Sequence, residues 1–306
     1  MNKINKMTRI GTFLILMILL TGGCNHSKKT IRIATKPMTE QFILGEMLGL
    51  LIEENTDLKV EITKGIGGGT SNIHPALMQG NFDLYPEYTG TAWQVILKKD
   101  SLLPPDQLWK EVEKIYRDSL HLIWTGLYGF NNTYGLGVSQ SLAQQYGLEK
   151  ISDLARYPDQ FTFGAEYDFF EIHKGYDALC EAYGLKFKKT TDMDIGLKYE
   201  AMKANKVDVL NVFTTDGQLE DANLKVLKDD KHFFPSYYCG TIVREQTLNK
   251  YPELLPALKK MDGILNDSIM VHLNYEVDLQ GKSERQVAAD FLKSKGLLNK
   301  EKTYGN

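Results

Sequence analysis

Residues 30–54, TIRIATKPMTEQFILGEMLGLLIEE, decide the fold class. The first part, residues 30–36, is rich in β-branched residues and alternates in polarity, which is typical of a strand. Residues 39–54 instead space their apolar residues three and four positions apart, which predicts a helix with one buried face. The residues on that face are Ile43, Leu44, Met47, Leu48 and Leu51. A strand that leads directly into a helix is the building unit of an α/β protein.

The same alternation of strands and helices continues downstream. Strand patterns lie at residues 58–65 and 83–88, and a glycine-rich turn at 67–69 leads into a short helix that we expect Thr70 or Ser71 to cap. Further strands are expected at residues 121–126, 161–165, 186–191, 207–213 and 237–243, and further helices at 105–119, 173–183, 195–205, 252–265 and 284–298. This order predicts a mostly parallel sheet whose ligand crevice lies at the carboxyl ends of the strands.

Chain length and charge narrow the class further. The chain has 306 residues, and single hydrophobic cores stop growing near about 250 to 300 residues, so we expect two lobes. The formal net charge is −3 at pH 7. A chain that is acidic overall is a poor partner for nucleic acid or for an anionic membrane surface, and we expect neither.

The N-terminus has the pattern of an export signal. Three basic residues in the first nine positions precede the apolar run at residues 13–20, which is too short for the ~20 residues that a membrane-spanning helix needs. Cys24 follows two glycines, as in the cleavage motif of bacterial lipoproteins, although Thr21 stands where that motif usually has leucine. We therefore expect a signal peptide at residues 1–23 and an extracytoplasmic protein that a lipid on Cys24 anchors to the bacterial cell membrane.

Aromatic residues in four separate segments indicate a binding site for an organic cation. The densest segment, residues 81–91 (NFDLYPEYTGT), contains Tyr88 beside a glycine-centred turn. Tyr134, Phe213 and Tyr237 also lie in short segments dense in aromatic, Gly, Pro or Asn residues. The face of an aromatic ring is negative, so several rings around a quaternary ammonium group each contribute up to ~2 kcal/mol once water is excluded. The pattern predicts a binding protein rather than a catalyst.

Motifs of the common enzyme and cofactor classes are incomplete in this chain. Residues 137–141, GVSQS, lack the final glycine of a nucleophile elbow, and residues 67–71 lack the GK[ST] ending of a phosphate-binding loop. We expect no enzyme activity, cofactor or metal. Besides Cys24, only Cys180 and Cys239 occur, without metal or redox spacing, and either one bridge between them or two separate thiols is consistent with the sequence.

Six segments, in this order along the chain, together resemble one protein family. They are KPMTEQ (36–41), GGGTSN (67–72), DLYPEYTGT (83–91), NNTYGLGV (131–138), FTTDGQL (213–219) and DDKHFFPSY (229–237). The chain resembles the substrate-binding proteins of ABC importers for quaternary amines such as glycine betaine, choline and carnitine. This resemblance implies a two-lobed, type II periplasmic-binding-protein-like fold, in which two hinge strands allow the lobes to close on a ligand. The first lobe would comprise residues 24–131 and 239–306, and the second lobe residues 132–238.

The resemblance also implies which residues bind the ligand. The cage for the ammonium group would consist of four rings: Tyr88, Tyr134, Phe213 and Tyr237. The family contacts ligand carboxylates through positions that correspond here to Lys36 and Thr91, and Asn132 would be a further polar contact. Apart from the resemblance, Asp216 and Gly217 are most simply interpreted as a turn, and the alternative is that Asp216 orients the cage residues.

At two positions this chain departs from the family pattern. Many relatives have tyrosine at the position of Phe213, and a phenyl ring keeps the negative ring face while losing only a hydroxyl group. Where relatives have an arginine that clamps the ligand carboxylate, this chain has Ile172, and an aliphatic side chain cannot replace a guanidinium group. We therefore expect preference to move away from glycine betaine. Choline, which has no carboxylate, fits the remaining polar contacts only loosely. The alternative is a larger betaine such as carnitine or ergothioneine, with His173 or Lys174 near its acid group.

The partners that the resemblance implies are a small quaternary ammonium ligand and the permease and ATPase subunits of an ABC importer. Two other functions are alternatives. The protein could pass ligand occupancy to a signalling protein as a receptor subunit. Some enzymes share the two-lobed fold and carry a cofactor on a cysteine in the cleft, which makes Cys239 the residue to inspect, but export and lipidation suit capture better than turnover.

Overall fold

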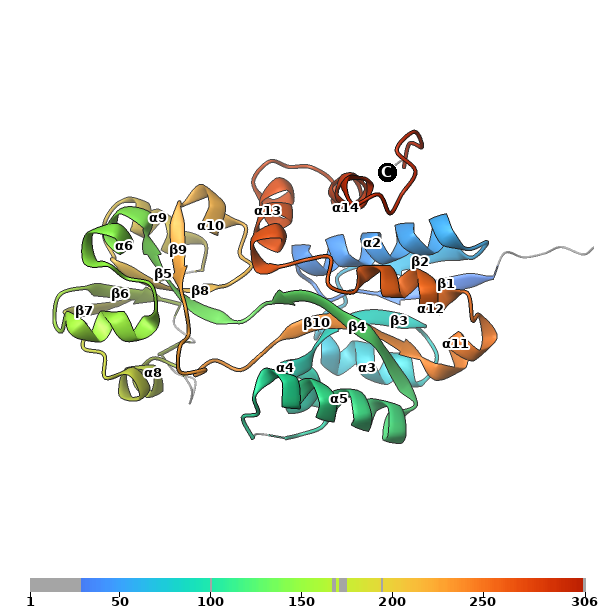
Figure 1. The fold of residues 1–306 in the computed structure, drawn as a ribbon, viewed down its shortest axis with the longest axis horizontal. Helices are drawn as coiled ribbons and strands as arrows, with labels where there is room; N and C mark the ends of the chain where they lie inside the picture. Colours follow the sequence, from blue (N-terminus) through green and yellow to red (C-terminus); the bar gives the residue numbers. More distant parts are fainter. Residues whose placement is uncertain (1–28, 100, 167–168, 171–174, 194, 305–306) are drawn as a thin grey trace, which may run out of the picture.

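The computed structural model describes residues 29–99, 101–166, 169–170, 175–193 and 195–304. Two β-sheets lie side by side, each with helices packed on it, and two extended chain crossings join them (Figure 1). We call the half with the N-terminal sheet the first lobe and the other half the second lobe. The expected signal peptide, Cys24, Ile172, His173 and Lys174 lie outside the described residues.

The sheet of the first lobe has the strand order β2-β1-β3-β10-β4. Its strands are β1 (Thr30–Ala34), β2 (Lys59–Thr63), β3 (Leu84–Tyr88), β4 (Leu122–Asn131) and β10 (Tyr238–Arg244). Strand β1 pairs in parallel with β2 and β3, whereas β10 is antiparallel to both of its neighbours, β3 and β4.

The sheet of the second lobe has the order β7-β6-β8-β5-β9 and the same kind of pairing. Its strands are β5 (Tyr134–Ser139), β6 (Thr162–Ala165), β7 (Lys189–Asp192), β8 (Val209–Phe213) and β9 (Leu224–Leu227). Strand β6 is parallel to β7 and β8, and β5 is antiparallel to β8 and β9. The two-lobed α/β fold is confirmed, but each sheet is mixed, because the strand that arrives from the other lobe enters antiparallel.

Helices cover both sheets. The first lobe holds α2 (Thr39–Asn55), α3 (Thr70–Met78), α4 (Thr89–Thr91), the π-helical turn η1 (Ala92–Ile96), α5 (Pro105–Leu120), α11 (Glu245–Lys250), α12 (Leu254–Leu258), the 3₁₀ turn η3 (Lys259–Met261), α13 (Asp267–Asp278) and α14 (Glu284–Ser294). The second lobe holds α6 (Gln140–Tyr146), the 3₁₀ turn η2 (Ile151–Arg156), α8 (Tyr176–Tyr183), α9 (Ile195–Lys203) and α10 (Gln218–Asp221).

Strand direction decides which ends face the other lobe. The chain passes from β4 directly into β5, so the carboxyl end of β4 and the amino end of β5 lie at the boundary between lobes (Figure 1). Since β10 is antiparallel to β3 and β4, its amino end and the carboxyl end of β3 lie at that boundary too. In the second lobe the same argument places the carboxyl end of β8 there. These ends form what we call the interlobe edge of each sheet.

The core of the first lobe is centred on α2. This helix packs against the sheet on one side, and α12, α13 and α14 contact it on others (Figure 1). The sequence pattern predicted a single buried face. Leu50 and Ile52, outside that face, are buried as well, because the C-terminal helices cover α2.

Several local features differ from the sequence prediction. Helix α3 is preceded by Gly69, whose positive φ of 51° favours glycine, and neither Thr70 nor Ser71 is the capping residue. Thr70 is instead the first helical residue. Strand β9 and helix α13 were not predicted; α13 begins after Asn266, whose side chain accepts a hydrogen bond from the Ile269 backbone N–H at 2.8 Å.

The two described cysteines are free thiols. Cys239 lies opposite Tyr88 in the β3–β10 ladder and is fully buried, and this burial raises the pKa of its thiol well above the ordinary value. A thiol held protonated in this way is a poor nucleophile or attachment point. Within the part of the chain that the structure describes, every helix is too short or too polar to cross a bilayer.

Candidate functional site

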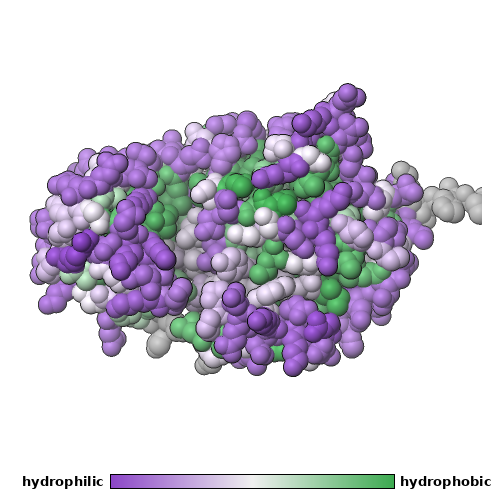
Figure 2. Space-filling model, in the orientation of Figure 1, coloured by the Kyte–Doolittle hydropathy of each residue, from purple (hydrophilic) through white to green (hydrophobic). Residues whose placement is uncertain are grey.

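A cavity of about 380 Å³ lies between the two lobes. Its lining comes from α2, the β4–β5 crossing, the turn after β8, and α13. The lining residues are Met38, Thr39, Glu40, Asn132, Phe213, Thr215, Asp216, Gly217, Asn274 and Asp278. We call it the interlobe cavity. The surface in the space-filling view is hollowed where the lobes meet, with hydrophobic residues beside the hollow and hydrophilic residues over most of the outer face (Figure 2).

Two of the predicted cage rings are in contact at the interlobe edge of the second lobe. Tyr134 begins β5 and Phe213 ends β8, and antiparallel pairing places them directly opposite each other. Their ring centroids are 4.7 Å apart with a 30° angle between the planes. Behind them Phe169 lies 5.5 Å from Tyr134 and Phe234 lies 6.2 Å from it, centroid to centroid. Rings packed in this way are held in place before any ligand arrives.

Tyr88 ends β3 at the interlobe edge of the first lobe and is buried. Its hydroxyl donates a hydrogen bond of 2.5 Å to Glu40 Oε1. Burial, followed by the nearby Glu40 carboxylate, raises the pKa of Tyr88 well above its ordinary value, so the phenol stays protonated. The Lys36 ammonium lies 4.6 Å from the centroid of the Tyr88 ring. One face of this ring therefore already contacts a cation in the structure.

The Lys36 ammonium group forms an ion pair with a buried carboxylate. Its Nζ donates a hydrogen bond to Glu87 Oε1. Glu87 is fully buried and also accepts hydrogen bonds from Thr70 Oγ1 at 2.7 Å, from the Tyr85 hydroxyl at 3.1 Å and from the Tyr88 backbone N–H at 2.6 Å. A carboxylate with four donors is well compensated for its loss of water. The Lys36 charge is neutralised here, so a ligand carboxylate would have to compete with Glu87.

Tyr237 lies just before β10, beside the carboxyl end of β3. Its ring packs on Gly90; a Cβ at that position would lie 2.6 Å from two ring atoms, so the contact requires glycine. The Tyr237 hydroxyl donates to Gln94 Oε1 at 3.0 Å, and its backbone N–H donates to Asn131 Oδ1 at 2.7 Å. Thr91 is the last residue of α4, one position beyond Gly90, and is partly exposed.

Asn132 and Glu40 join the hinge to the first lobe. Asn132, in the crossing from β4 to β5, donates from Nδ2 to Glu40 Oε1 at 3.0 Å. Burial raises the pKa of the Glu40 carboxyl, while hydrogen bonding by Tyr88, Thr215, Asn132 and Asn274 opposes the rise. Glu40 therefore connects a predicted cage ring with a residue of the hinge.

A second buried lysine lies behind Phe213. Lys198, on α9, is fully buried, and its Nζ lies 3.7 Å from both Glu166 Oε2 and Asp216 Oδ2 and 5.4 Å from the Phe213 ring centroid. Asp216 accepts hydrogen bonds from the Tyr199 hydroxyl and from the Phe213 backbone N–H. Burial raises the pKa of the Asp216 carboxyl, and the Lys198 charge opposes this. Asp216 therefore lies beside Phe213, and its role in orienting the cage stays a prediction.

The lobes touch directly where α13 meets the turn after β8. Asn274 Nδ2 donates to the Thr215 carbonyl oxygen at 2.8 Å. Gly217 lies so close to α13 that a Cβ on it would be 2.6 Å from the Tyr275 backbone nitrogen. This contact closes one side of the interlobe cavity.

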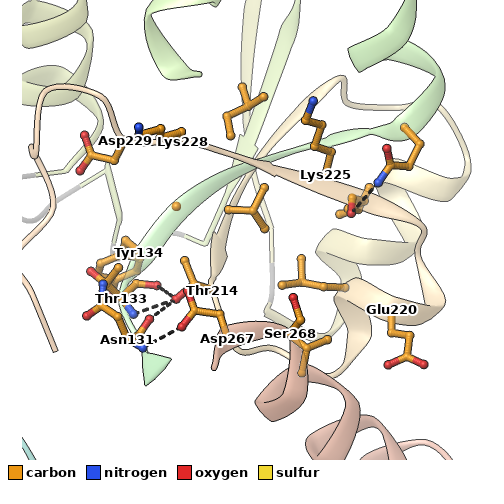
Figure 3. Close-up of a pocket in the computed structure, with 17 residues that line it drawn as sticks. Asn131, Thr133, Tyr134, Thr214, Glu220, Lys225, Lys228, Asp229, Asp267 and Ser268 are labelled. Atoms are coloured by element: carbon orange, nitrogen blue, oxygen red, sulfur yellow. Dashed lines mark hydrogen bonds between the residues drawn. The ribbon is translucent and has the colours of Figure 1, made fainter. Parts of the chain in front are cut away.

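A larger cavity, of about 660 Å³, lies between β9 and the start of α13 (Figure 3). Its labelled side chains include Lys225 and Lys228, and of the four predicted rings only Tyr134 borders it. At its hinge side Thr214 Oγ1 donates to the Asn131 carbonyl oxygen at 2.6 Å (Figure 3). Each of the two cavities has one predicted ring in its described lining, Phe213 in the interlobe cavity and Tyr134 here. The larger cavity has two lysines beside the carboxylates of Glu220, Asp229 and Asp267, whereas the described lining of the interlobe cavity has carboxylates and no lysine, which suits an organic cation better.

Sequence reasoning missed several residues of this region: Glu40, Glu166, Lys198 and Asn274. Glu40 and Lys198 lie in helical patterns, where a charged residue is usually on a solvated face, so no local signal marked them. Asn274 was missed because α13 itself was not predicted. Ile172, His173 and Lys174 lie outside the described residues, and the expectations about them stay predictions.

Two mixed sheets joined by two crossings, with aromatic rings and carboxylates at their facing edges, define a two-lobed solute-binding protein. Residues 29–294 match the model of the family described as the substrate binding domain of ABC-type glycine betaine transport system, and the chain belongs to this family.

Two related proteins and one solved structure are similar to this chain over most of its length. The chain is 47% identical over 294 residues to the ergothioneine transport permease/ergothioneine binding protein EgtU of Helicobacter pylori. The aligned region covers 95% of this chain but only 53%, about half, of that relative. The chain is 38% identical over 275 residues to the carnitine transport binding protein OpuCC of Listeria monocytogenes, with 89% of each covered. A crystal structure of a glycine betaine/carnitine/choline ABC transporter protein superimposes with a TM-score of 0.85 at 32% identity, over 89% of this chain and 100% of that one.

Proposed function

We propose that this protein captures a trimethylammonium compound between its lobes and delivers it to the permease of an ABC importer. The observation that carries the proposal is the interlobe cavity. Phe213, in contact with Tyr134, forms part of its wall, and its described lining includes Glu40, Asp216 and Asp278 but no lysine or arginine. Aromatic faces and carboxylates attract a permanent cation that cannot donate hydrogen bonds.

The roles of the individual site residues belong to the proposal. Tyr134 and Phe213 form the preassembled wall of the cage, and Tyr88 and Tyr237 approach from the first lobe when the lobes close about the two crossings. Asn132 is positioned to contact the ligand from the hinge, and Thr91 from the end of α4. Lys36 is paired with Glu87 and lies over the Tyr88 ring. It reaches a ligand carboxylate only if its hydrogen bond to Glu87 breaks.

The affinity expected of such a cage is moderate. Three or four cation–π contacts of about 1 to 2 kcal/mol each, together with the carboxylates and less the cost of association, correspond to micromolar binding, near −8 kcal/mol. The relatives named for ergothioneine and carnitine favour a ligand larger than glycine betaine. Choline and these larger betaines are the ligands to test first.

Cellular location follows from the same proposal. The protein acts outside the cytoplasmic membrane, the signal at residues 1–23 is removed, and Cys24 carries the lipid anchor. A single acyl chain holds a protein only weakly, so stable anchoring needs more than one chain. ATP hydrolysis by the importer's ATPase supplies the energy, and the binding protein itself turns over no substrate.

Isothermal titration calorimetry tests the proposal. Choline, glycine betaine, carnitine and ergothioneine are titrated into the protein beside 3,3-dimethylbutan-1-ol, which has the shape of choline but no charge. We expect micromolar binding of at least one cation and at least about 30-fold weaker binding of the uncharged compound, because the cation–π attraction is lost. Equal binding of choline and its uncharged counterpart would refute the cage.

A further inference from the structure

One lysine and two carboxylates form a small charged cluster beside the predicted cage ring Phe213. Lys198 Nζ lies 3.7 Å from Asp216 Oδ2 and 3.7 Å from Glu166 Oε2, and it lies 5.4 Å from the centroid of the Phe213 ring. Among the described residues, these two carboxylates are the ion-pair partners of Lys198. The cluster around Lys198, made up of Lys198, Glu166 and Asp216, therefore has one carboxylate more than it needs to balance the lysine.

The three members of the cluster differ in their access to the interlobe cavity. Lys198 is fully buried and Glu166 is 6% exposed, and neither belongs to the described lining of the cavity. Asp216 does belong to this lining, and 29% of its side chain is exposed. A ligand in the cavity can therefore contact Asp216, whereas Glu166 and Lys198 act on it only through the intervening protein.

Hydrogen bonds hold both carboxylates in place. Asp216 Oδ2 accepts from the Tyr199 hydroxyl and, at 3.4 Å, from the Phe213 backbone N–H. Glu166 Oε1 accepts from Asn211 Nδ2 at 2.8 Å. The Asp216 carboxylate is thus fixed beside a ring of the proposed cage before a ligand is present.

The balance of charge in this cluster decides what a cation in the cavity meets. If Asp216 were the one partner of Lys198, the two opposite charges would largely cancel for a third charge nearby. Glu166 supplies a second carboxylate, so one negative charge stays uncompensated. Coulomb attraction is stronger inside a protein than in water, and salt screens buried charges less than exposed ones. The described lining of the cavity has no lysine or arginine to oppose this charge.

We infer that Asp216 is the counter-ion of the bound ammonium group, and that Glu166 makes the charge of Asp216 available for this role by compensating Lys198. The inference rests on the proposed function and adds a specificity-determining carboxylate to the proposed ring cage. The rings and Asp216 then both attract the cation. Asp216 decides how strongly the site prefers a cation over an uncharged molecule of the same shape.

Two substitutions remove one negative charge each from different members of the cluster. Asp216→Asn and Glu166→Gln both keep an amide oxygen that can accept the existing hydrogen bonds. Both also leave Lys198 with one carboxylate, so neither variant buries an unpaired charge, and we expect both to fold. Circular dichroism checks the fold. In each variant the cluster becomes neutral overall.

Titrations of the unmodified protein and of both variants at pH 7 test the inference. Choline, glycine betaine, carnitine and ergothioneine are titrated by calorimetry, and the uncharged 3,3-dimethylbutan-1-ol is followed by ligand-observed NMR. For each cation that binds the unmodified protein, we expect about tenfold weaker binding or more to Asp216→Asn and at least about threefold weaker binding to Glu166→Gln, because the cavity loses its uncompensated charge. The uncharged alcohol should bind all three proteins within about twofold.

Two results would overturn the inference and leave the ring cage standing. If Glu166→Gln binds the cations as tightly as the unmodified protein does, the charge balance of the cluster has no part in binding. If Asp216→Asn weakens the cations and the alcohol by the same factor, Asp216 only positions Phe213. If none of the four cations binds the unmodified protein, the proposed function fails and the inference fails with it.

Lys203 provides a matched control on the same helix, α9. It pairs with Glu200 at 3.1 Å and with Asp221, but all three side chains are exposed and none belongs to the described lining of the cavity. Asp221→Asn also removes one of two carboxylates around a lysine, in a place where water and salt screen the charge. We expect this variant to bind cations within about twofold of the unmodified protein. A loss as large as that in Glu166→Gln would assign the attraction to the overall charge of the lobe and would overturn the inference.

Discussion

The two interlobe edges each contain a buried lysine, and the two lysines differ in how fully they are partnered. Lys36, in the first lobe, donates directly to Glu87, whose oxygens take three further hydrogen bonds. Lys198, in the second lobe, has two carboxylates at 3.7 Å and no hydrogen bond among the described residues. The Lys36–Glu87 network is complete, whereas the cluster around Lys198 retains an ammonium group without a hydrogen bond among the described residues.

This difference in hydrogen bonding predicts that the side chains at the two edges differ in how readily they move. A completed buried network fixes the orientation of Tyr88 at a known cost in desolvation. A loosely partnered cluster beside Phe213 can shift when a ligand and the first lobe arrive, because few hydrogen bonds must break first. If the lobes close as proposed, we expect the Lys36–Glu87 network to stay fixed and the side chains around Lys198 to adjust behind the Tyr134–Phe213 pair.

Lys36→Met should produce the largest effect on stability. The substitution leaves Glu87 as a buried carboxylate without its cation, which costs about 3 to 5 kcal/mol. Chemical denaturation followed by circular dichroism measures this loss. A loss below about 1 kcal/mol would contradict the description of the first edge as a tightly coupled network.

Lys198→Met should cost less, about 2 kcal/mol, because Nζ has no hydrogen bond to lose and Asp216 keeps its bonds to Tyr199 and to the Phe213 backbone. The same denaturation experiment compares the two variants directly. If Lys198→Met destabilises the protein as much as Lys36→Met does, the contrast between the edges is wrong.

Tyr134→Ala should weaken ligand binding by about tenfold, since it removes one cation–π contact and the ring that holds Phe213. Tyr134→Phe is the matched control: it keeps the ring and should bind within about twofold of the unmodified protein. Calorimetry with the tightest ligand gives both numbers. Equal losses in the two variants would mean that the hydroxyl group, and not the ring face, matters.

A smaller effect is expected from pH. Burial raises the pKa of Glu40, and a bound cation favours the ionised carboxylate, so affinity should fall severalfold as the pH drops through the raised pKa of the free protein. Below that pKa the bound cation must expel a proton, which opposes binding. Titrations at a series of pH values below 7 measure the slope. The slope should flatten in Glu40→Gln, and an unchanged slope would assign the pH dependence to another group.

The sequence predicted the parts of this architecture that depend on local pattern. The strand at β1 and the helix at α2 followed from periodicity. The four rings were predicted from short segments dense in aromatic, Gly, Pro or Asn residues, together with the family resemblance. The facing of the two edges could not be predicted from local pattern alone, since it depends on β5 and β10 entering their sheets antiparallel.

The buried charges were not predictable for a different reason. Glu40 and Lys198 lie in helices where the pattern gives a polar residue no reason to be buried, and only the covering of α2 by the C-terminal helices and the packing of α9 on the second sheet bury them. The expectation of a helix cap at Thr70 was wrong because the Thr70 hydroxyl donates to Glu87 instead. Tertiary contacts took precedence over local preference in each case.

A crystal structure of the protein with the tightest-binding trimethylammonium compound tests the central claim most directly. The account predicts the ammonium nitrogen within about 6 Å of the Tyr134 and Phe213 ring centroids, in the interlobe cavity, with Tyr88 and Tyr237 on the opposite side. A ligand bound instead in the cavity between β9 and α13, or held by a carboxylate clamp away from these rings, would contradict it.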